Sequence, residues 1–199
     1  MRRERVGFFG GSFDPFHFGH LNLAISLLEA HALDSVLFCP AYVSPFKKAC
    51  STVASSEHRM QMVRLGIQEI KHFAMLDWEM KQKKPSYTID TIQKLKKEST
   101  AEFFLLLGMD QLEYLHKWKK IEELLELAQP LIGSRENKQI TLDHLPVSLH
   151  SFIDKGRTII PMMDINSTII RQRLSRKQFC GHLVPQLILD YIKHNHVYI

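Results

Sequence analysis

The sequence has few cysteines and no long apolar run. Its 199 residues include three cysteines, Cys39, Cys50 and Cys180, and no two of them form a Cys-x-x-Cys pair. An odd count without that spacing argues against a disulfide framework or a zinc site, and it favours free thiols in a reducing compartment. No stretch approaches the roughly 20 apolar residues that span a bilayer. We therefore predict a cytoplasmic protein with no membrane partner.

Internal repeats, low-complexity tracts and an obvious linker are also absent. With 45% hydrophobic residues the chain can bury a core, so we predict a single domain over residues 1–199, with a helical C-terminal portion at about 162–199. The net charge of +5 attracts polyanions, including nucleotides. The basic residues are dispersed, which argues against a nucleic-acid partner. The sequence carries no signal for an oligomeric state.

Short apolar runs alternate with longer amphipathic segments. Strands are predicted at residues 6–10, 35–39, 73–77, 102–107, 130–134 and 157–161. Helices are predicted at residues 20–32, 56–71, 88–97, 110–116, 121–127, 167–174 and 184–194, and the polar segment 135–155 is expected to be a loop. This order is typical of an α/β protein with a Rossmann-like, doubly wound parallel sheet and helices on both faces. Ligands of such sheets bind beyond the carboxyl ends of the strands.

The strongest motif is GGSFDPFHFGH at residues 10–20, between the first predicted strand and a helix. Gly10 and Gly11 permit a close approach to the backbone, and the N–H groups of a strand-to-helix turn suit phosphate. His17 and His20 lie on one side of the first helical turn if the helix begins near Phe18. Their spacing also suits zinc, but no third ligand is evident. A phosphate site is the favoured interpretation.

A second motif, INSTIIR, covers residues 165–171. Ser167 or Thr168 can begin a helix whose free N–H groups attract an anion, and Arg171 follows one turn later with a guanidinium group that suits phosphate. Taken alone, this segment is better explained as an ordinary capped surface helix with a solvated arginine.

Together these motifs resemble the HxGH and SxxIR signatures of the nucleotidyltransferase superfamily. Within it, the chain resembles the bacterial nicotinate-nucleotide adenylyltransferases over essentially its whole length. The stretches that carry the resemblance are residues 10–20, PAYVSPFKK at 40–48, PSYTIDT at 85–91, GMDQL at 108–112 with Trp118, INSTIIR, and VPQLILDYI at 184–192. One departure is that the family usually reads PPHK or PPHR where this chain has Ser44-Pro45-Phe46-Lys47.

The resemblance implies transfer of the adenylyl group of ATP to nicotinate mononucleotide, with Mg²⁺ as the expected metal. The implied catalytic residues are His17, His20, Lys47 and Arg171. The implied ATP-binding residues are Gly10, Gly11, Ser12, Phe13, His17, Gly19, His20, Gly108, Asp110, Ser167, Thr168 and Arg171. The implied mononucleotide-binding residues are Lys47, Tyr87, Thr88, Asp110 and Trp118.

Simpler interpretations exist for the later residues. Thr88 could cap a helix, Trp118 could pack in the core, and Gly108 could be a turn residue. Rival functions are a sister enzyme such as phosphopantetheine adenylyltransferase, a cytidylyltransferase, a synthetase fragment and a nucleic-acid-binding module. An NAD-dependent dehydrogenase is disfavoured because residues 10–15 do not form a GxGxxG motif.

The implied reaction needs no enzyme nucleophile, because the attacking oxygen already belongs to the phosphate of the mononucleotide. Its barrier comes from bringing two anionic phosphates into line, so positioning and charge neutralisation should dominate catalysis. We therefore expect His17, His20, Lys47 and Arg171 to form a basic cluster around the phosphates.

Overall fold

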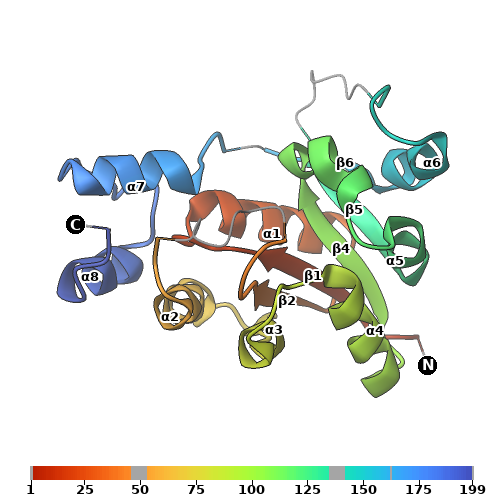
Figure 1. Ribbon diagram of the computed structural model, residues 1–199, viewed down its shortest axis with the longest axis horizontal. Coiled ribbons are helices and arrows are strands. Elements are labelled where there is room, and N and C mark those ends of the chain that lie inside the picture. Colours follow the sequence, from red (N-terminus) through yellow and green to blue (C-terminus); the bar gives the residue numbers. More distant parts are fainter. Residues whose placement is uncertain (1, 46–52, 135–141, 162, 199) are drawn as a thin grey trace. The chain divides into compact units, whose positions relative to one another are not determined.

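The computed structural model describes residues 2–45, 53–134, 142–161 and 163–198. Each strand is followed by one or two helices along the chain, as Figure 1 shows. The strands are β1 (Arg5–Gly11), β2 (Ser35–Pro40), β3 (Phe73–Met75), β4 (Glu102–Gly108), β5 (Ala128–Ser134) and β6 (Arg157–Ile159). The helices are α1 (Phe18–Ala30), α2 (Ser56–Ile67), α3 (Trp78–Gln82), α4 (Thr88–Glu98), the 3₁₀ helix η1 (Met109–Lys117), α5 (Ile121–Leu127), α6 (Val147–Gly156), α7 (Ser167–Ser175) and α8 (Gln186–His194).

The strands form one six-stranded sheet in the order β3-β2-β1-β4-β5-β6. Pairing is parallel between β1 and β4, between β4 and β5, and between β5 and β6. The order reverses between β1 and β4, and at such a point α/β sheets bind their ligands beyond the carboxyl ends of the strands. These observations confirm the predicted α/β class and its parallel sheet.

The chain divides into two compact units, each built from several segments. The first unit comprises residues 1–9, 23–37 and 87–162, and the second comprises residues 10–22, 38–86 and 163–199. Each unit is described by itself below. The single domain over residues 1–199 stays a prediction.

The first unit has its core around β4 and β5. Residues Phe103–Leu107 of β4 are all buried, as are Leu131 and Ile132 of β5. Such continuous apolar runs are typical of strands covered on both faces in a parallel sheet. Helix α5 supplies Leu124 and Leu125 to the buried set, and α6 supplies Leu149 and Ile153.

The second unit contains the packed pair α2 and α8, which lie side by side in Figure 1. Met62 and Val63 of α2 are fully buried, as is Ile188 of α8. A hydrogen bond of 2.8 Å joins His58 Nδ1 of α2 to the Tyr191 hydroxyl of α8. In the described parts of the chain, no helix has the length and apolar character to cross a membrane.

Two helices differ from the sequence-based expectation. Residues 147–156, predicted as part of a loop over 135–155, form α6, because Leu149 and Ile153 lie four residues apart and both enter the core. Residues 135–141 of that predicted loop lie outside the described residues. The short helix α3 was also not expected, since five residues carry too little periodicity to reveal it.

Candidate active site

The loop that follows β1 has an unusual backbone. Phe13 adopts a left-handed conformation with φ of 50°, which is uncommon for a bulky residue, and the Asp14–Pro15 peptide bond is cis. The Phe13, Asp14 and Phe16 side chains are nearly or fully inaccessible to solvent. The loop is therefore anchored by buried side chains rather than left free on the surface, which gives residues 10–20 a defined shape.

His17 and His20 lie against each other at the start of α1. Their rings stack with centroids 3.7 Å apart and an interplanar angle of 23°. The backbone N–H of His17 donates to His20 Nδ1 at 3.2 Å. Gly19 allows this arrangement, because a Cβ at that position would lie 3.0 Å from His17 Nδ1. His17 is buried, and its Nδ1 has no hydrogen-bond partner within the described residues.

The aromatic surroundings decide the protonation of this pair. The Phe13 ring meets the His20 ring edge-on at 5.0 Å, and the Phe16 ring lies 5.5 Å from it. Burial lowers the pKa of His17 to about 4, although a backbone hydrogen bond opposes the shift. Burial, and then repulsion from His17, hold the pKa of His20 well below its usual value. Both rings are neutral near pH 7, so the predicted basic cluster carries less charge than expected from the sequence.

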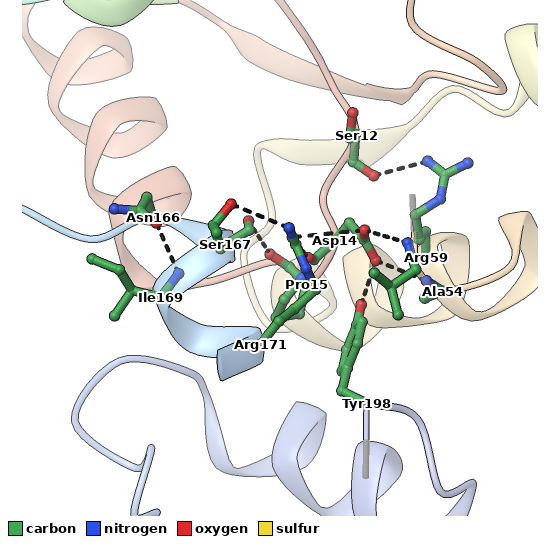
Figure 2. Close-up of polar contacts among 12 residues, drawn as sticks. Ser12, Asp14, Pro15, Ala54, Arg59, Asn166, Ser167, Ile169, Arg171 and Tyr198 are labelled. Atoms are coloured by element: carbon green, nitrogen blue, oxygen red, sulfur yellow. Dashed lines mark hydrogen bonds and ion pairs between the residues drawn. The ribbon is translucent and has the colours of Figure 1, made fainter. Parts of the chain in front are cut away.

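The Asp14 carboxylate accepts several hydrogen bonds from other segments of the chain. Its Oδ2 accepts a hydrogen bond from the Val53 N–H at 2.9 Å, and its Oδ1 accepts one from the Ala54 N–H at 3.1 Å. The Tyr198 hydroxyl donates to Oδ1 at 2.7 Å. Figure 2 shows the contacts of Ala54 and Tyr198 with the Asp14 carboxylate. Asp14 therefore ties the motif loop to the segment that precedes α2 and to the segment that follows α8.

Arg59 of α2 is a structural residue that the sequence analysis did not identify. It is buried, and its guanidinium donates to the carbonyl oxygens of Ser12 at 2.8 Å, Ala41 at 2.7 Å and Tyr42 at 3.0 Å. Burial lowers its pKa, and the nearby Asp14 carboxylate opposes that shift. An arginine within an amphipathic helix normally indicates a solvated face, so no local pattern could have singled it out.

Helix α7 contacts the same loop. Asn166 caps the helix by accepting the Ile169 N–H at 2.9 Å, which leaves Ser167 free to donate to the Pro15 carbonyl at 3.0 Å. Arg171 Nη1 donates to the Asp14 carbonyl at 2.6 Å (Figure 2). Its Nη2 donates to the Thr168 hydroxyl at 3.1 Å. The first motif ends at residue 20 and the second begins at residue 165. These hydrogen bonds therefore bring together two motifs that are far apart in the sequence.

Four of the predicted mononucleotide-binding residues, Tyr87, Thr88, Asp110 and Trp118, lie in the first unit. Tyr87 precedes α4, and Thr88 begins it. The Lys119 ammonium, next to Trp118 in the chain, lies 4.5 Å from the centre of the Tyr87 ring and 3.0 Å from Asp90 Oδ1. This cation therefore holds the chain beside Trp118 against the start of α4, so these two predicted stretches are brought together.

Gly108 and Asp110 also belong to the first unit, at the end of β4 and the start of η1. Asp110 is exposed, and its Oδ2 accepts a hydrogen bond from Gln111 Nε2 at 2.8 Å. A Cβ at position 108 would lie 2.5 Å from Asp110 Oδ1. Glycine at this position therefore leaves room for the aspartate side chain to fold back over the strand end.

Lys47, predicted to contact phosphate, lies outside the described residues, as does Phe46 of the departing SPFK stretch. Over the described ranges, no group of three or more His, Cys, Asp or Glu side chains is arranged to hold a metal ion. The structure thus offers the histidine pair no third zinc ligand in those ranges. Magnesium differs from zinc, because it usually binds through substrate phosphates, waters and one or two carboxylates.

Comparison with known proteins agrees with this geometry. The family model described as cytidylyltransferase-like matches residues 8–173. A protein of Methylacidiphilum infernorum is 37% identical over 98% of this chain and 92% of its own length, and one of Bacillus pumilus is 35% identical over 98% of both chains. Both carry the name "probable nicotinate-nucleotide adenylyltransferase".

Solved structures share the fold. The nicotinic acid mononucleotide adenylyltransferase of Plasmodium falciparum, in complex with NaAD, superposes with a TM-score of 0.76 over 98% of this chain and 97% of its own. The same enzyme in complex with APC gives the same TM-score. At 20% and 19% identity these likenesses concern the fold, whereas the curated relatives match nearly the full length at higher identity. The chain therefore belongs to the nicotinate-nucleotide adenylyltransferase family, among the cytidylyltransferase-like proteins.

Proposed function

We propose that this protein transfers the adenylyl group of ATP to nicotinate mononucleotide, giving nicotinate adenine dinucleotide and pyrophosphate in NAD biosynthesis. The observation that carries the proposal is the match to curated relatives at 35–37% identity over 98% of the chain. The contacts of Ser167 and Arg171 with the loop of the first motif support it, because they join the two motifs into one site.

The reaction forms a bond between a phosphate oxygen of the mononucleotide and the α-phosphorus of ATP, while the bond to the pyrophosphate leaving group breaks. The nucleophile is already an anion, so the protein has only to align the groups and stabilise the developing charge. We assign the α-phosphate contacts to His17 and His20. Since both rings are neutral near pH 7, they act as N–H donors rather than as resident cations.

Arg171 supplies the permanent positive charge in this arrangement. Its guanidinium is oriented by the Asp14 carbonyl and the Thr168 hydroxyl, and a guanidinium has five N–H donors, so donors remain for phosphate oxygens. We assign the remaining ATP contacts to Gly10, Gly11, Ser12, Phe13, Gly19, Gly108, Asp110, Ser167 and Thr168. Lys47, Tyr87, Thr88, Asp110 and Trp118 are assigned to the mononucleotide.

We further propose that Mg²⁺ enters with ATP. The Asp14 carboxylate already accepts three hydrogen bonds, so it is poorly suited to be a metal ligand. An ion held mainly by phosphate oxygens and water fits this donor set better than one held in a protein cage. Bound Mg²⁺ would neutralise part of the charge of the phosphates. The small-molecule substrates ATP and nicotinate mononucleotide suit a cytoplasmic enzyme that needs neither a nucleic-acid nor a membrane partner.

The experiment is pyrophosphate release by the purified protein with ATP and Mg²⁺, offering nicotinate mononucleotide, nicotinamide mononucleotide and phosphopantetheine in parallel. We expect strong release with the nicotinate substrate. Release only with phosphopantetheine would retain the reaction class and refute the substrate, whereas no release with any substrate would refute the function.

Substitution of His17 tests whether the activity depends on the histidine motif. His17→Ala should lower kcat by about 10²–10³ while changing both KM values little, because a donor to the transition state is lost. His72→Ala, at an exposed position, is the matched control and should match the wild type. An unchanged kcat in His17→Ala would show that the motif has been misassigned.

A further inference from the structure

We propose that Tyr198 is a positioning residue for ATP binding, acting through Asp14 on Arg171. This inference rests on the proposed function, since it takes Arg171 to be a phosphate-binding residue. Its basis is the hydrogen bond of 2.7 Å from the Tyr198 hydroxyl to Asp14 Oδ1, which links residues 184 positions apart in the chain. In Figure 2 the tyrosine ring rises from the segment after α8 toward the carboxylate.

The segment after α8 is held so that this contact can form. Val197 is buried, and its N–H donates to the Ile192 carbonyl at 3.0 Å. Tyr198 itself has a left-handed backbone with φ of 68°. A tyrosine pays a conformational cost for that backbone, so surrounding contacts must stabilise it. Burial, the hydrogen bond to Asp14 and the Asp14 charge raise the pKa of the Tyr198 hydroxyl, which therefore remains a proton donor.

The Asp14 carboxylate is surrounded by hydrogen-bond donors and by the Arg171 guanidinium. It is almost fully buried, and besides Tyr198 it accepts the N–H groups of Val53 and Ala54. Its Oδ2 lies 3.7 Å from Arg171 Nη1, which is too long for a direct hydrogen bond. Because three other donors already satisfy the carboxylate, Arg171 is bound by the Asp14 carbonyl instead, at 2.6 Å.

Loss of the Tyr198 hydroxyl would strengthen the attraction between the Asp14 carboxylate and Arg171. Without the hydroxyl, Oδ1 keeps the Ala54 N–H but loses a second donor, so the buried carboxylate attracts nearby cations more strongly. The Arg171 guanidinium, with Nη1 3.7 Å from Oδ2, is one such cation. A guanidinium drawn into a closer ion pair with Asp14 has less freedom to bind phosphate oxygens. The same change would loosen the loop that carries His17. Tyr198 therefore keeps Arg171 available to ATP without touching the nucleotide itself.

The chain offers a matched control. The Tyr191 hydroxyl of α8 is hydrogen-bonded to His58 Nδ1 of α2 at 2.8 Å. Among the described contacts, Tyr191 has none with Asp14. Tyr198→Phe and Tyr191→Phe each remove one hydroxyl group that joins the C-terminal segment to the rest of the second unit. A role in stability alone predicts similar behaviour of the two variants.

The test compares both variants with the wild type in three measurements: steady-state kinetics, binding of α,β-methylene ATP by calorimetry, and thermal unfolding. For Tyr198→Phe we expect the KM for ATP and the Kd of the analogue to rise about tenfold, as for loss of a hydrogen bond to a charged group. The KM for nicotinate mononucleotide should stay as in the wild type. Tyr191→Phe should leave both nucleotide affinities unchanged.

A double-mutant cycle with Asp14→Asn tests the route of the effect. If Tyr198 acts through the Asp14 charge, adding Tyr198→Phe to Asp14→Asn should weaken binding of the ATP analogue far less than it does in the wild type. Additive effects, equal effects of the two tyrosine variants, or parallel increases in the KM of both substrates would overturn the inference. Inactivity of the wild-type protein would instead refute the proposed function, and the calorimetric comparison would still decide the role of Tyr198.

Discussion

His17 and His20 lie against phenylalanine rings at the start of α1, and this environment sets their chemistry. Burial keeps both rings neutral near pH 7, because a charged imidazole would lose most of its hydration there. Neutral rings can face each other at 3.7 Å without the repulsion that two imidazolium ions would suffer. His17 Nδ1 has no hydrogen-bond partner among the described residues, which is costly in a buried position and consistent with a site built for a ligand.

The depressed pKa of His17 has a consequence for stability. The pKa is about 4 in the folded chain against 6.5 as the ordinary value, so the unfolded chain binds more protons between these pH values. The free energy of unfolding should therefore fall as the pH is lowered from 6.5 toward 4, with His17 contributing at most about 3 kcal/mol of the loss. Urea denaturation at a series of pH values measures this.

His17→Asn should flatten that pH dependence, because asparagine does not titrate. If His17→Asn and the wild type lost stability in parallel on acidification, His17 would not be buried in its neutral form.

At the scale of elements, α2 organises the loops around the motif. Its N-terminal flank supplies the Val53 and Ala54 N–H groups to Asp14, and Arg59 in its first turns holds three carbonyl groups of two loops. A planar guanidinium can reach several acceptors at once, which one ammonium group does less well. The helix thus fixes the shape of residues 12–15 and 41–42 from a single buried side chain.

We expect Arg59→Met to lower the free energy of unfolding by about 3 kcal/mol or more, because the carbonyls of Ser12, Ala41 and Tyr42 lose their donors. Arg59→Lys should recover only part of that loss. Arg64→Met, at an exposed position on the same helix, should change stability by about 0.5 kcal/mol or less. Urea denaturation compares the three variants, and a loss in Arg59→Met as small as that in Arg64→Met would contradict the role of the buried arginine.

At the scale of the whole molecule, the assigned residues fall into the two compact units. The histidine motif and the start of α7 belong to the second unit, whereas the stretches around Thr88 and Trp118 belong to the first. Each set is held by its own contacts: Arg171 and Ser167 on the loop of the motif, and Lys119 on Tyr87 and Asp90. Apart from Gly108 and Asp110, the residues assigned to ATP lie in the second unit, whereas Tyr87, Thr88 and Trp118, assigned to the mononucleotide, lie in the first. Each substrate should therefore slow amide exchange mainly in a different set of residues.

Amide hydrogen exchange, measured with each ligand separately, tests this expectation. The ATP analogue alone should slow amide exchange over residues 10–20 and 165–171, since the ligand orders the backbone that it contacts. Nicotinate mononucleotide alone should slow exchange over residues 87–91 and around Trp118. Protection of residues 87–91 by the ATP analogue, with no change over 10–20, would show that the substrate assignments are reversed.

The sequence alone determined the α/β class and most element positions, because apolar periodicity and glycine-containing strand ends are local signals. It also singled out the segments 10–20 and 165–171, whose phosphate-binding role stays a prediction. It did not reveal α6, whose two core residues follow a long polar stretch. The neutral state of the histidines, the buried Arg59 and the Tyr198–Asp14–Arg171 connection were decided only by tertiary structure. Each depends on burial or on partners distant in the chain, which no local pattern of residues records.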